Sequence, residues 1–111
     1  MKTAARLVEP LCLPAIHPGE VLAEELKTIG VSVAALSRAI DVPQSRMAEV
    51  VNGKRSVTAD TALRLACYFG TSARFWMNLQ TSYDLAVVDE KCGLQIAAVV
   101  RPQTIARGRK A

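Results

Sequence analysis

Residues 44–58 read QSRMAEVVNGKRSVT, a short amphipathic segment followed by a loop with two adjacent cations. Three apolar residues recur at the spacing of one helical face: Met47, Val50 and Val51. Asn52-Gly53 then stops the helix, because glycine readily adopts the left-handed conformation that ends helices. Lys54 and Arg55 come directly after this stop. The stretch therefore predicts a short helix with one buried face, followed by a turn that presents positive charge.

The other face of this helix carries polar groups of the kind that bind nucleic acid. They are Ser45, Glu49 and Asn52, with Gln44 and Arg46 on the flanks of this face. Amides can pair with adenine and arginine with guanine, while small hydroxyls fit either base. If the helix entered a major groove, Lys54 and Arg55 would lie against the sugar-phosphate backbone. The alternative is a plain solvated helix face, and this helix alone would not exclude it.

A second short helix is expected directly upstream, ending before Pro43. Ser32 can cap its amino end, because a serine hydroxyl accepts a hydrogen bond from a free N–H of the first turn. Its apolar residues share one face: Val33, Leu36 and Ile40. The residue before a proline is driven away from helical angles, so the helix ends there. Two short helices joined by a tight turn have the organisation of a helix-turn-helix.

Three further helices are expected, which makes the fold all-α. They begin at residues 17–20 (HPGE), at Thr58 and at Ser72, where the residues suit a helix amino end. The apolar faces expected for the first two are Leu22, Leu26 and Ile29, and then Leu63, Ala66 and Cys67. The last helix carries a stripe of Phe75, Trp76, Leu79 and Tyr83. That stripe is interpreted as core or a dimer seam rather than a ligand pocket.

The two ends of the chain have a different character from the helices. Residues 1–16 contain two prolines and no sustained period, which favours an extended arm. Gly93 is expected to end the last helix, and residues 94–100 are an apolar run that fits a strand or an extended packing segment. Residues 101–111 resemble a solvated basic tail. The expected organisation is an arm (1–16), a helix-turn-helix domain (17–92) and a C-terminal extension with the tail (93–111).

Composition limits the class of protein. The 111 residues suit one domain, and the net charge of +4 favours a polyanionic partner without requiring one. Three cysteines at wide spacing and a single histidine argue against a disulfide framework, a zinc site or a nucleophile–base pair. Cys67 is interpreted as a small buried residue. We expect a cytoplasmic protein with no membrane segment, no enzymatic activity and no cofactor.

The chain resembles the HigA-type antitoxins of the Xre group of phage-repressor-like helix-turn-helix proteins. The resemblance covers about residues 15 to 90 and rests on motifs in the family's order and spacing. They are HPGE (17–20), VVNGKR (50–55), TADTALRLA (58–66), FWMNLQ (75–80) and YDL (83–85). One position departs from the pattern: phage repressors commonly have a phosphate-binding glutamine just after the first serine of the second helix, and here Val33 occupies it.

The resemblance implies a five-helix, lambda-repressor-like domain that binds operator DNA as a homodimer and represses its own operon. It also implies a tight complex with a small toxin similar to RelE, a ribosome-dependent mRNA endonuclease. Gln44, Ser45, Arg46, Glu49 and Asn52 fall on the family's recognition-helix positions, and Lys54 and Arg55 on its backbone-contacting loop. The alternative is a stand-alone regulator of the same fold without a toxin.

Two partner surfaces are expected from the residues. The apolar residues from Tyr83 to Val88 exceed what one helix needs for its own core, so Tyr83, Leu85 and Val88 are candidates for a dimer interface. The acidic residues at the first helix, Glu20, Glu24 and Glu25, could attract a basic, RNA-binding toxin. The alternative is that these three carboxylates only stabilise the amino end of the helix and face water.

Overall fold

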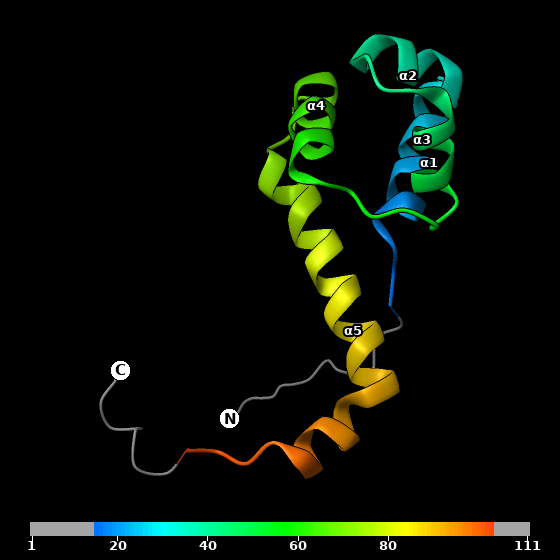
Figure 1. Cartoon of the computed structure of the whole chain (residues 1–111). Helices are drawn as coiled ribbons and strands as arrows, with labels where there is room; N and C mark the ends of the chain where they lie inside the picture. The colour runs from blue at the N-terminus through cyan, green and yellow to red at the C-terminus, as the bar shows by residue number, and fades with distance from the viewer. Residues whose placement is uncertain (1–14, 104–111) are drawn as a thin grey trace.

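The computed structural model describes residues 15–103 and contains five α-helices within that range (Figure 1). In chain order they are α1 (Pro18–Ile29), α2 (Val33–Ile40), α3 (Gln44–Val51), α4 (Ala59–Phe69) and α5 (Ala73–Val99). The expected all-α class and the order of the five helices are confirmed. Residues 1–14 of the expected arm and residues 104–111 of the expected tail lie outside the described part of the chain.

Side chains next to each helix set most of the helix starts. His17 begins α1 with a capping box: its Nδ1 accepts from the Gly19 N–H at 2.8 Å, and a Glu20 carboxylate oxygen accepts from the His17 N–H at 3.3 Å. Three hydroxyls cap α2, α4 and α5 in the same way, those of Ser32, Thr58 and Ser72. By contrast α3 begins after Pro43 without a side-chain cap. The sequence motifs at the helix starts are therefore local hydrogen-bonding devices.

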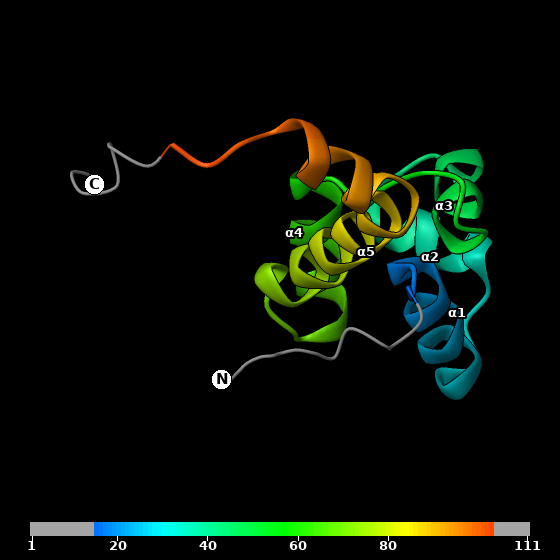
Figure 2. The ribbon, with the colours of Figure 1, turned by 90° about the horizontal axis from the view of Figure 1, so that it is seen from below.

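The helices form two groups around one core. In Figures 1 and 2, α1, α2 and α3 lie together, and α4 lies beside the first half of α5. The buried apolar side chains of this core are Leu22, Leu26, Leu36, Ile40, Val42, Met47, Val50, Val57, Ala62, Leu65 and Trp76. Arg64 of α4 links the groups, because its guanidinium donates to the carbonyl of Ile40 at the end of α2, at 2.9 Å. The turn after α2 is thereby fixed against α4.

The HPGE motif packs α1 against both α3 and α5. A side chain at Gly19 would collide with the carbonyl oxygen of Val50, so the first turn of α1 approaches the last turn of α3 at a distance that only glycine permits. The buried His17 ring contacts the ring of Tyr83 on α5 edge to face, with centroids 4.8 Å apart. These contacts determine where the carboxyl end of α3 lies.

The expected inner face of α4 is wrong. Leu63 and Cys67 are exposed, and the residues that face the core are Thr61, Ala62 and Leu65. Leu63 and Leu65 lie on opposite sides of α4, and the packing of α4 against α2 and α5 leaves Leu65 in the core. Two other residues that were expected on buried faces, Ile29 of α1 and Phe75 of α5, are 47% and 42% exposed.

The expected end of the last helix at Gly93 is also wrong. α5 continues through Gly93 to Val99, so residues 94–99 are helical rather than a strand or an extended segment. A glycine inside a helix costs only about 1 kcal/mol relative to alanine, which its helix-forming neighbours can offset. The Asp89 side chain lies over Gly93 and would collide with a β-carbon there. At 27 residues, α5 is roughly 40 Å long, and Figure 1 shows its second half extending away from the other helices.

Candidate DNA-binding surface

The candidate surface begins with α3, whose two faces are clearly divided. Met47 and Val50 are buried against α1 and α2, at 0% and 1% exposure, and Val51 is partly buried. All five polar residues expected to face a nucleic acid are exposed: Gln44, Ser45, Arg46, Glu49 and Asn52. By the helical period, Ser45, Glu49 and Asn52 lie opposite the buried face, and Gln44 and Arg46 lie on the flanks of this open side.

The loop after α3 is held at both ends. At its start the Lys54 N–H donates to the carbonyl of Glu49 at 2.8 Å, and Gly53 has a positive φ of 77°. At its far end Val57 is buried, and its N–H donates to the side-chain oxygen of Gln80 at 2.7 Å. Lys54 and Arg55 lie exposed between these two anchors. Positive charge is therefore presented on a short, constrained segment beside α3.

Two of the candidate residues contact each other, which the sequence analysis missed. Arg55 Nε lies 2.7 Å from the Glu49 carboxylate, so an ion pair joins the loop to the outward face of α3. Both side chains are about half exposed, at 51% and 47%. Ion pairs this exposed contribute only about 0–1 kcal/mol, because water competes for both charges. A phosphate can therefore replace Glu49 as the partner of Arg55 at little cost.

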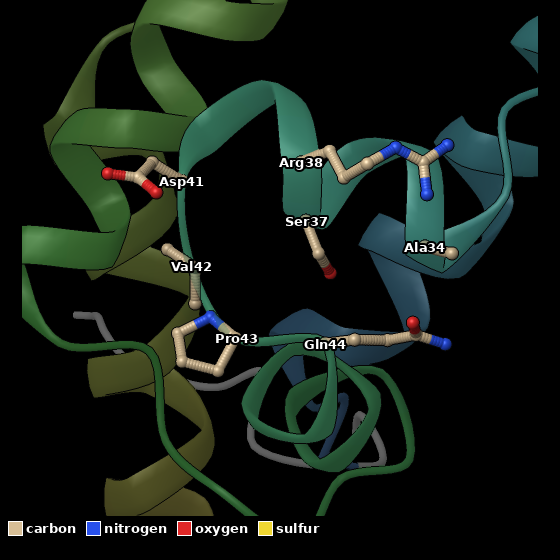
Figure 3. A pocket seen from close by; sticks show the side chains of 7 residues that line it. All are labelled: Ala34, Ser37, Arg38, Asp41, Val42, Pro43 and Gln44. Carbon is tan, nitrogen blue, oxygen red and sulfur yellow. The ribbon is translucent and has the colours of Figure 1, made fainter.

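A shallow hollow lies between α2 and α3 and adds one residue to the candidate surface. It is lined by Ala34, Ser37, Arg38, Asp41, Val42, Pro43 and Gln44. In Figure 3 the side chains of Arg38 and Gln44 reach the same end of this hollow, beside Ala34, while Asp41 lies at the other end. Arg38 is exposed and forms no ion pair within residues 15–103. Arg38 lies opposite the buried face of α2, so the helical period of the sequence could have predicted its exposure.

Val33, which departs from the family pattern, faces the protein rather than solvent. It is partly buried and packs against the core, while Ser32 beside it caps α2 through the Ala35 N–H at 3.0 Å. An apolar side chain there cannot supply the phosphate hydrogen bond that glutamine would make. Arg38 is the one cation of α2, and it is exposed.

The residues expected at the two protein interfaces lie outside this surface. Glu24 and Glu25 are exposed on α1 and form no ion pair in the described part of the chain, whereas Glu20, also exposed, belongs to the capping box. On α5, Leu85 and Val88 are 67% and 50% exposed. The third candidate for the dimer interface, Tyr83, is half-buried, and its ring packs against His17.

The described part of the chain offers neither a metal-binding cluster nor a membrane-spanning helix. Residues 15–103 contain no group of three histidine, cysteine or acidic side chains placed to bind a metal ion. Over the same residues, no helix combines the length and the apolar character that crossing a bilayer requires.

The five-helix fold and the α2–α3 unit define a helix-turn-helix protein, and residues 22–76 match the family model described as Helix-turn-helix. Virulence-associated protein I of Dichelobacter nodosus is 53% identical over 79 residues, which are 70% of this chain and 73% of that protein. A HigA-family addiction module antidote protein of Coxiella burnetii superimposes with a TM-score of 0.80 and 46% identity, over 82% of this chain and 100% of that one.

A further solved structure is similar to the chain over most of its length. It is antitoxin HigA of Pseudomonas aeruginosa with the higBA promoter, with a TM-score of 0.78 and 44% identity, over 80% of this chain and 98% of that one. The chain belongs to the HigA-type antitoxins of the Xre helix-turn-helix family.

Proposed function

We propose that the chain binds operator DNA with α3 in the major groove and represses its own operon. The observation that carries this proposal is the open polar face of α3 beside a fixed cationic loop. Base contacts are assigned to Gln44, Ser45, Arg46 and Asn52, and phosphate contacts to Lys54, Arg55 and Arg38, while Glu49 on the same side of α3 serves as the partner that Arg55 exchanges for phosphate. The similar Pseudomonas aeruginosa antitoxin was solved with the higBA promoter, which supports the proposed binding of DNA.

Gel shifts on an operon-promoter duplex and on a scrambled duplex test the division of roles. Replacing Gln44 or Arg46 with alanine should cost roughly 1–3 kcal/mol on the promoter and little on the scrambled duplex, because only the right base offers the lost contact. Replacing Lys54 and Arg55 should weaken both complexes alike and lower the salt slope by about one unit per lost phosphate contact. Equal losses on the two duplexes from both pairs of substitutions would contradict this division.

The second part of the proposed function is neutralisation of a toxin. We propose that the partner is a small protein similar to RelE, a ribosome-dependent mRNA endonuclease, as the family membership suggests. Co-expression with the product of the neighbouring gene, followed by co-purification, is the direct test. A stable complex that abolishes mRNA cleavage supports the proposal. DNA binding without such a complex is the result expected of a regulator that acts alone.

Glu20, Glu24 and Glu25 are proposed as the surface that attracts the toxin. Glu20 and Glu24 lie opposite the buried residues Leu22 and Leu26, so they point away from the core, and none of the three lies on α3 or its loop. A protein that approaches RNA is basic, so exposed carboxylates speed its encounter with the antitoxin. DNA and toxin can then be bound at the same time.

Changing these three glutamates to glutamine should slow toxin association and reduce its dependence on salt. The control is Asp89→Asn with Glu90→Gln, which removes exposed carboxylates from α5 instead. Association as fast as in the wild-type protein, measured by stopped flow at two salt concentrations, would leave these glutamates with only their helix-end role.

The protein is further proposed to act as a homodimer. One recognition helix reads only a few base pairs, and two helices spaced by about one turn, roughly 34 Å, supply the missing affinity. The exposed Leu85 and Val88 on α5, next to Tyr83, are proposed as the centre of the dimer interface.

A further inference from the structure

A buried glutamine on α5 is used to hold the loop that follows α3. The Gln80 side chain is 4% exposed, and its Oε1 accepts from the Val57 N–H at 2.7 Å, a contact between residues 23 positions apart. A buried amide and a buried backbone N–H both require partners, and here each satisfies the other. No helical or turn hydrogen bond replaces this one, because Val57 lies between α3 and α4.

Asp84, one turn further along α5, determines which way the glutamine amide faces. Its Oδ1 accepts from Gln80 Nε2 at 2.9 Å. An ionised carboxylate can only accept hydrogen bonds, so the NH₂ end of the amide must point to Asp84 and the oxygen to Val57. The two side chains form a relay from the exposed surface of α5 to the backbone of the loop.

This relay is one of the two anchors between which the loop cations lie. The first anchor is the bond from the Lys54 N–H to the carbonyl of Glu49 at 2.8 Å, and the second is the bond from Val57 to Gln80. Lys54, Arg55 and Ser56 span the interval, and Lys54 has no ion-pair partner within residues 15–103. A change at the second anchor therefore shifts the cations and, on the outward face of α3, disturbs only the exposed ion pair of Arg55 with Glu49.

We propose that Gln80 and Asp84 are positioning residues that hold Lys54 and Arg55 in place for contact with the DNA backbone. This inference rests on the proposed DNA binding and deepens it. Phosphate contacts carry little sequence information, so loss of the relay reduces affinity for every duplex and leaves the preference for the promoter intact. A role in stability alone would change the unfolding temperature without changing the salt slope of binding.

The first test variant is Gln80→Met, which keeps the side-chain length and removes both hydrogen bonds. Its control is Gln95→Met, at an exposed glutamine of the same helix. We expect faster hydrogen exchange at the Val57 amide. On a scrambled duplex, the slope of log K against log salt concentration should become less steep by about one unit. The ratio of promoter to scrambled affinity should stay within roughly twofold of the wild-type ratio, because base contacts are untouched.

The second variant is Asp84→Ala, which changes an exposed residue and keeps the test valid if Gln80→Met does not fold. Asp89→Ala is its control, since it removes the same charge from α5. Compared with this control, Asp84→Ala should change the salt slope in the same direction as Gln80→Met, by a smaller amount. Faster exchange at Val57 with wild-type binding would overturn the inference alone. A wild-type protein that does not bind DNA would refute the proposed function itself.

Discussion

The ion pair between Glu49 and Arg55 leads to an unusual expectation. Neutralising the Glu49 carboxylate on α3 should strengthen DNA binding. Glu49→Gln keeps the shape of the side chain and frees the Arg55 guanidinium, 2.7 Å away, for a phosphate. A pair exposed to this degree is worth roughly 0.2–1 kcal/mol. Because about 1.4 kcal/mol corresponds to a tenfold change, affinity should rise by roughly 1.5- to fivefold on any duplex.

The control for this change is Asp60→Asn, which breaks the other exposed ion pair, between Asp60 and Arg64 at 2.9 Å, and removes the same charge. Fluorescence anisotropy on the promoter duplex and on a scrambled duplex measures both variants. Glu49→Gln should exceed the control on both. A loss confined to the promoter would refute the reasoning, because it would mean that Glu49 accepts a hydrogen bond from a cytosine. No change on either duplex would show that Arg55 does not contact phosphate.

Three further expectations concern the core and the dimer. Gly19→Ala should destabilise the fold by roughly 1–3 kcal/mol, because the added methyl group collides with the Val50 carbonyl; thermal unfolding measures this, and an unchanged melting temperature would contradict it. Leu65→Ala should lower the free energy of unfolding by about 2–5 kcal/mol, whereas Leu63→Ala should lower it little because Leu63 is exposed; chemical denaturation of the two variants measures the difference. Leu85→Asp with Val88→Asp should give a monomer in sedimentation with weaker promoter binding, and an intact dimer would place the interface elsewhere.

Helix starts were predictable from the sequence because they depend on neighbours a few residues apart. Ser32, Thr58 and Ser72 cap the helices that they were expected to cap, and the division of α3 into a buried and an open face follows its period. Helix ends and inner faces were less predictable. The continuation of α5 past Gly93 and the choice of Leu65 depend on tertiary packing, which local propensity does not determine.

The same limit applies to the candidate site. Its residue types could be read from the sequence, and a period of 3.6 residues places them on the open side of α3 and its flanks. The ion pair of Glu49 with Arg55 depends on how the chain turns after α3, and the bond of Gln80 to Val57 joins segments far apart in sequence. Arg38 was overlooked for a different reason. It lies on the preceding helix, where the family pattern directs attention to position 33 instead.

The division of α3 also bears on how such proteins diverge. None of the exposed residues of α3 belongs to the core or caps a helix, since the helix is held by Met47 and Val50 and begins after Pro43 without a side-chain cap. Substitutions at exposed positions of this kind usually change stability by less than about 0.5 kcal/mol. Mutations on this face can therefore accumulate during evolution without unfolding the protein. Duplicated copies in one genome can acquire separate operators while they keep the same scaffold.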